Sequence, residues 1–275
     1  MPELPETETI ARDLDREIAG ARITGVRVIK PDVLRGVDAA TLGRRVSGTS
    51  IERCWRRAKL VVLDLSSNDR LIVQPRFTGG LLIDDGSLAA RERQYATVEF
   101  ALDDGCMLLY RDIRRLGTVA LMAREEFSAY VSQLGVEPLD RAFTATHLSA
   151  LLRVARRTVK QVLMDQRVVA GIGNIYANEA LWRAGIDPSR VASALSTNET
   201  ADLRDAIVGV LTESIDARGT SFRDYRDARG GRGRFVEQLA VYGRGGEPCL
   251  RCGHRLVETH AIDGRTTVLC ANCQR

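Results

Sequence analysis

Residues 249–273 read CLRCGHRLVETHAIDGRTTVLCANC and contain two Cys-x2-Cys pairs, Cys249 with Cys252 and Cys270 with Cys273. Each pair can place two thiolates on one metal ion, and two pairs together give the tetrahedral four-sulfur coordination typical of zinc. Because a closed site of four cysteines leaves no open position for a substrate, we expect one structural zinc ion. Two disulfides or a chance arrangement are the alternative interpretation.

The segment between the two cysteine pairs predicts a β-hairpin. Asp263-Gly264 is a two-residue turn signal, and strand-forming residues flank it on both sides. Arg265 directly follows this turn, so we expect its side chain near the hairpin tip. Two interpretations fit that position: an ordinary solvent-exposed arginine, or a cation that enters a DNA groove.

Working outward from this stretch, we expect a separate zinc-finger domain over 236–275 and a helical domain over 125–235. Apolar residues recur with helical spacing in the latter until the Gly- and Arg-rich stretch 218–235. The sequence AGIGN at 170–174 predicts a turn between two helices, with Asn174 as a cap of the second. The stretch 218–235 offers little to pack, which predicts a mobile loop.

The first part of the chain has a different pattern. Residues 2–20 carry apolar side chains every fourth position and predict a helix, with Gly20 as its stop. Residues 21–122 are short apolar runs separated by turn clusters such as SSND and DDG, which predict a β-sandwich. We therefore expect an α+β protein whose first domain, 1–124, combines an N-terminal helix with a β-sandwich.

Charge and composition permit nucleic-acid binding without requiring it. The 275 residues carry a net charge of +4, yet residues 53–59 contain four cations and no anion. The only lysines are Lys30, Lys59 and Lys160, in a chain otherwise supplied with arginine. No secretory signal and no apolar stretch of ~20 residues occurs, so we expect a cytoplasmic protein that is not secreted and has no membrane partner.

The N-terminus offers a nucleophile of its own. If Met1 is removed, Pro2 has a free secondary amine, and N-terminal amines titrate near pH ~8, far below lysine. No other nucleophile motif is apparent in the sequence. The alternative interpretation is that Pro2 simply begins the first helix.

Five stretches resemble the formamidopyrimidine-DNA glycosylase family, which is related to endonuclease VIII. They are MPELPETET at the start, RRAK at 56–59, LMDQRVVAGIGNIYANEAL at 163–181, VYGRGGEPCLRCG at 241–253 and GRTTVLCANCQ at 264–274. Because they cover both ends and the middle of the chain in the family's order, the sequence is identified as a member of that family. The resemblance implies a helix-two-turn-helix DNA-binding domain in the helical region.

The resemblance also implies an activity, that of a bifunctional DNA glycosylase/AP lyase of base excision repair. Such an enzyme flips the damaged nucleotide out of the duplex, because the base cannot be reached inside the stack. It forms a Schiff base with the opened sugar and cuts the strand by β- and δ-elimination. The implied partner is double-stranded DNA with damaged bases or abasic sites, bound by a nucleoid-associated monomer without an organic cofactor.

Roles for single residues follow from the same resemblance. Pro2 corresponds to the nucleophile, Glu3 to the acid/base group that assists sugar-ring opening, and Glu6 to a supporting acidic position. We group Lys59 and Arg265, which correspond to phosphate ligands at the lesion, with the catalytic residues. The further positions expected to contact DNA are Lys160, Asn174 and Tyr242.

Flipping leaves a hole in the duplex that wedge residues commonly fill. Relatives use a Met in HLGMSG and an Arg and a Phe in PRRFG, whereas this chain reads QPRFTG at 74–79 and IRRLG at 113–117. A buried core position is the alternative for the phenylalanine of the first motif. The residues expected at these DNA-contacting positions are Gln74, Phe77, Arg114 and Leu116.

Lesion choice is open at this point. The LPETET start and the stretch 218–235 resemble the formamidopyrimidine branch and favour oxidised purines, namely 8-oxoguanine and formamidopyrimidines. One alternative is an endonuclease VIII-like enzyme that prefers oxidised pyrimidines or abasic sites. Others are a catalytically inactive damage-binding protein, and a zinc-ribbon adaptor that leaves the N-terminal motif unexplained.

Overall fold

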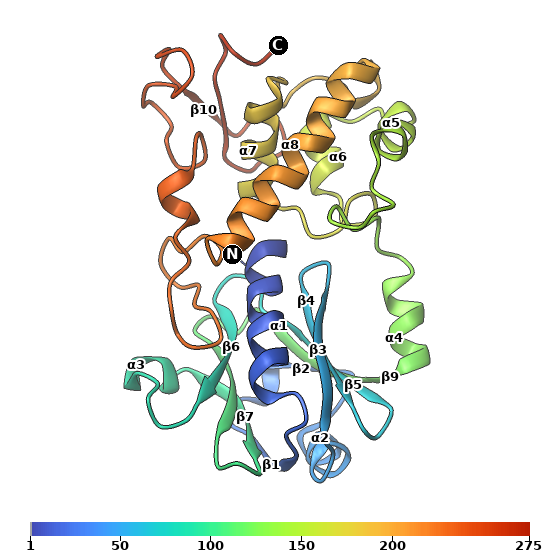
Figure 1. The fold of residues 1–275 in the computed structure, drawn as a ribbon, viewed down its shortest axis with the longest axis vertical. Coiled ribbons are helices and arrows are strands. Elements are labelled where there is room, and N and C mark those ends of the chain that lie inside the picture. Colours follow the sequence, from blue (N-terminus) through green and yellow to red (C-terminus); the bar gives the residue numbers. More distant parts are fainter. Residues whose placement is uncertain (1) are drawn as a thin grey trace. The chain divides into compact units, whose positions relative to one another are not determined.

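A computed structural model describes residues 2–275 (Figure 1). The chain forms two compact units, Met1–Ser132 with Ile215–Val236 and Gln133–Ser214 with Glu237–Arg275. Within the described residues, no helix is both long enough and apolar enough to cross a membrane.

The first unit contains helix α1 (Leu4–Ile18) and two β-sheets. One sheet is fully antiparallel in the order β1 (Ile23–Val28), β7 (Ala96–Leu102), β8 (Met107–Asp112) and β6 (Gly79–Asp84). The other has the order β2 (Leu34–Arg35), β9 (Thr118–Ala123), β5 (Asp69–Gln74), β4 (Leu60–Leu65) and β3 (Ile51–Arg57), with β2 parallel to β9. The shorter helices of this unit are η1 (Pro31–Val33), α2 (Ala39–Val46), α3 (Ala90–Arg93) and α4 (Arg124–Val131).

The core of this unit lies between the inner faces of the two sheets and one face of α1. Ile10 and Leu14 of the helix are fully buried, as are Leu63 of one sheet and Phe100 of the other. Figure 1 shows α1 running beside β3 and β4, with which it makes contacts. Burial of this apolar face stabilises the helix, because short helices are marginal without tertiary packing. The predicted helix and β-sandwich are confirmed.

The segment Ile215–Val236 belongs to the first unit, which differs from the predicted boundary of a helical domain at 235. The expectation that 218–235 has little to pack was wrong, because Tyr225 and Ala228 are buried in the core beside α1. Arg218 forms an ion pair with Asp13 of α1. Arginine forks pair readily with carboxylates, so a Gly- and Arg-rich composition does not by itself prevent packing.

The second unit is built from helices and a small hairpin. Its helices are α5 (Ala145–Arg153), α6 (Val159–Met164), α7 (Asn174–Ala184), η2 (Ala192–Ala194) and α8 (Thr197–Asp216), whose last two residues belong to the first unit. The predicted turn before α7 is present, with Gly171 at φ +87°. The predicted capping role of Asn174 was wrong: Gly173 is the N-cap and Asn174 the first helical residue. The helix η3 (Phe235–Gln238) leads into the cysteine-rich end.

The hairpin pairs β10 (Val257–Thr259) with β11 (Thr267–Leu269) in antiparallel register. The expected two-residue turn was wrong, because residues 260–266 form a longer loop between the strands. Within this loop the Gly264 amide donates to the His260 carbonyl at 3.0 Å, and Gly264 has φ +73°. The Asp263-Gly264 signal therefore marks a tight bend inside a wider loop, not the whole connection.

Candidate functional site

The first residues of the described chain form a buried acidic cluster at the start of α1. Pro2 is buried, and Glu3 and Glu6 are 1% and 0% exposed. The Glu3 amide donates to Glu6 Oε2 at 2.8 Å, and the Thr220 amide donates to Glu6 Oε1 at 2.7 Å. The positive end of the helix dipole favours carboxylates here. If Met1 is removed, the amine at position 2 would lie next to the carboxylate at position 3, and this pairing can join a nucleophile to a proton-transfer group.

Lys59 lies in the turn between β3 and β4, half-buried, directly after Ala58 with φ +52°. Arg56 stabilises this turn. Its guanidinium donates to the Ala58 carbonyl at 3.0 Å and to Glu8 Oε2 at 2.7 Å. Because Glu8 is on α1, the Lys59 turn is tied to the helix that begins at the acidic cluster. The structure thus brings the predicted Lys59 turn and the N-terminal residues onto one framework.

The expected wedge residues lie in two neighbouring loops of the first unit. Phe77 is 47% exposed and Leu116 is 41% exposed, so the core interpretation of Phe77 was wrong. The guanidinium carbon of Arg114 lies 5.3 Å from the centroid of the Phe77 ring. Gln74, at the end of β5, is half-buried. Two exposed apolar side chains beside an arginine form a surface suited to stacking on a base.

Asp112, which the sequence analysis did not identify, connects the two loops that carry the predicted wedge residues Phe77 and Leu116. Its carboxylate is 2% exposed and accepts from Thr78 Oγ1 at 2.5 Å and from the Gly117 amide at 2.8 Å. The buried Tyr110 hydroxyl donates to it at 3.2 Å, and burial together with this carboxylate raises the tyrosine pKa. An aspartate that ends an apolar strand two residues before Arg114 was the available sequence signal.

Lys160 does not lie on the surface. It is 0% exposed, and its ammonium donates to Thr267 Oγ1 at 2.7 Å and to the Thr266 carbonyl at 3.3 Å. The Asp263 carboxylate lies 3.4 Å away. In this structure Lys160 therefore has no exposed surface to offer a phosphate, and it supports the loop that carries Arg265.

Amide side chains fix the same loop of the second unit. Asn174 Nδ2 donates to the Thr266 carbonyl at 2.9 Å, and Gln161 Nε2 donates to the Ile262 carbonyl at 3.1 Å. Asn178 Oδ1 accepts from the Val268 amide at 2.8 Å. Arg265 remains exposed on this braced loop, a geometry that suits capture of an anion. The sequence analysis did not identify Gln161 or Asn178 as residues of the site. The only available signal was that Gln161 follows Lys160 and that Asn178 lies one helical turn after Asn174.

The chain before the first cysteine pair is held by Glu179 of α7. Its carboxylate is 4% exposed and accepts from the amides of Ala240, Val241 and Tyr242 at 2.8, 3.0 and 2.7 Å. Burial raises the pKa of Glu179, and the three amide donors oppose that rise. The predicted contact residue Tyr242 is half-buried at the end of this clamp.

The four predicted metal ligands come together in the second unit. The sulfur atoms of Cys249, Cys252, Cys270 and Cys273 all lie within 4.8 Å of one another, and none is in a disulfide. Burial raises the pKa of Cys249, but hydrogen bonds from Trp182 Nε1 and nearby amides outweigh it and lower that pKa to about 6, whereas the neighbouring sulfur atoms raise the pKa of Cys273. A thiolate is the form that binds zinc, so the cluster fits one structural zinc ion.

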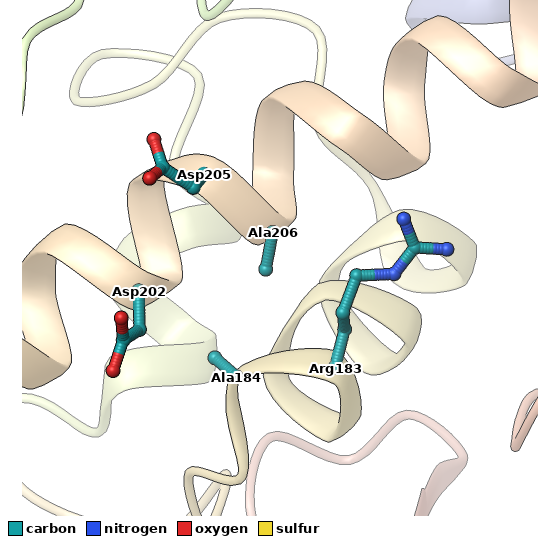
Figure 2. Close-up of a pocket in the computed structure, with 5 residues that line it drawn as sticks. All are labelled: Arg183, Ala184, Asp202, Asp205 and Ala206. Carbon is teal, nitrogen blue, oxygen red and sulfur yellow. The ribbon is translucent and has the colours of Figure 1, made fainter.

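Two hollows lie on the surface of the protein, one in each unit. One, of about 290 Å³ in the first unit, is lined by the predicted wedge residue Phe77 and by Thr220, Phe222, Arg223, Asp224 and Tyr225. Another, of about 390 Å³ between α7 and α8, is lined by Arg183, Ala184, Asp202, Asp205 and Ala206 (Figure 2). Only the first contains residues that the sequence indicated.

Comparisons with known proteins agree with this arrangement. Three family models match: the formamidopyrimidine-DNA glycosylase N-terminal domain at 1–119, its H2TH domain at 134–226, and a zinc finger found in FPG and IleRS at 246–275. The chain is 40% identical over 276 residues to a formamidopyrimidine-DNA glycosylase of Desulfitobacterium hafniense, with 100% of both covered.

Solved structures of similar fold come from Lactococcus lactis. A mutant FPG in complex with DNA that contains Fapy-dG superposes with a TM-score of 0.91 at 30% identity, covering 100% of both chains. The wild-type protein with DNA that contains an oxidised pyrimidine gives a TM-score of 0.90 at 29% identity, again over 100% of both chains.

The buried Lys160 supports a first prediction. Replacing Lys160 with Met should lower the free energy of unfolding by about 3–5 kcal/mol, because Asp263 is left as a buried carboxylate without its cation. Urea unfolding measures the loss. The double variant Lys160→Met/Asp263→Asn should lose less than the sum of the single variants; simple additivity would contradict the pairing.

Zinc removal gives a second prediction. A chelator should extract one zinc ion per chain and abolish the hydrogen-exchange protection of residues 240–275, because the metal–sulfur bonds that join the two cysteine pairs are lost. Amides of strands β4 and β5 in the first unit serve as the internal control. Unchanged protection of β10 and β11 in zinc-free protein would show that the metal does not hold this hairpin.

Proposed function

Because the chain belongs to the formamidopyrimidine-DNA glycosylase family, we propose that Pro2 is the nucleophile with which it removes oxidised purines from duplex DNA. It is a DNA glycosylase of base excision repair, and AP lyase activity is characteristic of its family. The observation that carries the proposal is the buried Pro2-Glu3-Glu6 cluster at the start of α1. It supports a reaction centred on the chain's own N-terminal amine, once Met1 is removed.

The proposed chemistry uses one covalent intermediate. The amine of Pro2 attacks C1′ of the extruded nucleotide, the bond to the base breaks, and the sugar ring opens to leave an iminium. Glu3 moves protons to the ring oxygen and between later intermediates. The iminium acidifies the C2′ protons, so β-elimination breaks the C3′–O bond and δ-elimination then breaks the C5′–O bond, which cuts the strand. Water then hydrolyses the Schiff base, which releases the sugar remnant and restores the amine of Pro2. Cys249, Cys252, Cys270 and Cys273 would hold the zinc ion, which would order the hairpin between them.

Further residues of each unit are proposed to bind the DNA backbone. In the first unit Lys59 would contact a phosphate. In the second unit the Asn174 region, Tyr242 and the exposed Arg265 would do so, since a helix start and an arginine fork both suit phosphate oxygens. Lys160 would act indirectly, through the loop that it supports.

The wedge loops would fill the space left by the extruded nucleotide. The exposed ring of Phe77 can stack on a base, and Arg114 beside it carries donors suited to the orphaned partner base. Leu116 adds apolar surface. The rigid carboxylate of Asp112 beneath both loops supports this function, because a wedge must resist the force that restores stacking.

Lesion choice rests on the hollow beside the wedge. Its walls come from Phe77, Thr220 and residues 222–225, and its size of about 290 Å³ is near the lower end for small-ligand sites. Aromatic walls suit the flat rings of an oxidised purine. The second candidate is a preference for oxidised pyrimidines, which the complex of the Lactococcus lactis relative with such DNA favours. We place the working enzyme at the nucleoid in the cytoplasm, as a monomer.

Trapping with borohydride tests the nucleophile. Mature protein should form a covalent adduct with abasic-site duplex DNA, and Pro2→Gly should reduce the amount trapped by at least tenfold, because the secondary amine forms the iminium most readily. Val154→Ala, an exposed position of the second unit, serves as the control. Full trapping by protein that retains Met1, or DNA binding without any nick, would overturn the proposal.

A panel of duplexes tests the lesion preference. We expect kcat/KM to be highest for 8-oxoguanine and formamidopyrimidine, with thymine glycol and dihydrouracil at least tenfold lower, because the hollow favours a bicyclic or formamido-substituted ring. Cleavage of a preformed abasic site reports the lyase step separately. Higher kcat/KM for the oxidised pyrimidines would establish the second candidate instead.

A further inference from the structure

Glu6 joins two parts of the first unit that the proposed reaction uses separately. Its carboxylate is 0% exposed. One oxygen accepts the amide of Glu3, the residue next to the nucleophile, at 2.8 Å. The other accepts the amide of Thr220, which lines the hollow proposed for the base, at 2.7 Å. A single buried side chain therefore spans from the reacting end of the chain to the wall that would contact the base.

The fit around this carboxylate leaves little room for movement. Gly219 has φ +84°, and a Cβ built there would lie 3.0 Å from Glu6 Cγ and 3.1 Å from its Oε1. A Cβ on Gly233 would lie 2.2 Å from the Gly219 carbonyl oxygen. The Tyr225 hydroxyl approaches the Glu6 carbonyl at 3.4 Å. Only residues without a side chain permit this approach, so the segment is shaped to the Glu6 carboxylate.

Carboxylates further along α1 dock the same segment, but away from the reacting end. Asp13 pairs with Arg218, and Glu17 pairs with Arg229. Positions 6, 13 and 17 share one face of a helix, since they are separated by whole turns. Asp13 and Glu17 hold the segment to the helix. Of these three, Glu6 is the one that also binds the backbone of Glu3.

We propose that Glu6 is a positioning residue that couples contact with the damaged base to the placement of Pro2 and Glu3. The inference rests on the proposed function. When a base occupies the hollow, it fixes the position of the Thr220 backbone. Because the Glu6 carboxylate binds the amides of both Thr220 and Glu3, it then fixes the position of the Glu3 backbone as well. An abasic site has no base to occupy the hollow, so its cleavage should depend much less on this connection. The chemistry requires two acceptor oxygens, which a carboxylate has and an amide lacks.

The variant Glu6→Gln tests the coupling. Its amide group must present a donor to one of the two backbone N–H groups, so one bond is lost. We expect the single-turnover rate of base excision from a formamidopyrimidine duplex to fall by about tenfold or more, with cleavage of a preformed abasic site changed less than threefold. Asp15→Asn is the matched control, because Asp15 on α1 also accepts a backbone amide, that of Cys54 at 2.8 Å, and the oxygen of Asn can still accept it.

Gly219→Ala alters the contact between Glu6 and Thr220 from the Thr220 segment. It provides a second test if Glu6→Gln folds poorly. It should show the same selective loss of base excision, because the added methyl would lie 3.0 Å from both Glu6 Cγ and the Tyr225 ring and would displace the segment from Glu6. The pH profile of excision should keep its shape in both variants. A shifted profile, equal loss on both substrates, or no loss on either would overturn the coupling. If the wild-type protein forms no adduct at all, the proposed function itself fails.

Discussion

The burial of α1 against two sheets is the constraint from which the candidate chemistry follows. Ile10 and Leu14 are inaccessible to solvent, so the helix axis is fixed by the core of the sandwich. A nucleophile at the end of a free chain would sample many positions and lose most of its reactivity to entropy. Because position 2 immediately precedes this anchored helix, it inherits the rigidity of the whole first unit.

Both units immobilise their candidate residues with buried polar side chains that bind main-chain groups. The first uses buried carboxylates, Glu6 and Asp112, that gather backbone amides from separate loops. The second uses both kinds of side chain: Lys160, Asn174 and Gln161 donate to carbonyls of one loop, and the Glu179 carboxylate accepts three amides ahead of the first cysteine pair. Each solution satisfies main-chain groups that have no partner in a sheet or helix, and an irregular segment becomes as ordered as its neighbours.

Much of the fold could be predicted because it rests on local patterns. Apolar periodicity indicated α1 and the strands, and the cysteine spacing indicated the metal cluster. Contacts between distant segments could not be predicted this way. The sequence around Lys160 contains nothing that marks it as buried, since its partners, Thr266 and Thr267, come more than a hundred residues later.

Turn chemistry explains two further differences. Asn174 is a good capping residue in isolation, but a carbonyl of the hairpin loop offers its side chain a partner, and Gly173 takes the N-cap. Asp263-Gly264 favours a tight turn, yet the contacts of Asp263 with Lys160 and with the Arg265 amide stabilise a wider loop. The Arg- and Gly-rich segment misled for a related reason: its partners are acidic residues of α1, far away in the sequence.

The two loops that carry Phe77 and Leu116 have exposed tips and a closely packed base. Gly79 and Gly117 pack so closely around the Tyr110 hydroxyl that a Cβ at either would lie within 2.7 Å of it, whereas the tip side chains extend into solvent. Tip residues can therefore be exchanged for others of different bulk while the foundation keeps its shape. Substitutions at the tips can therefore change the side chains that the protein presents to a DNA duplex without changing the packed scaffold that carries them.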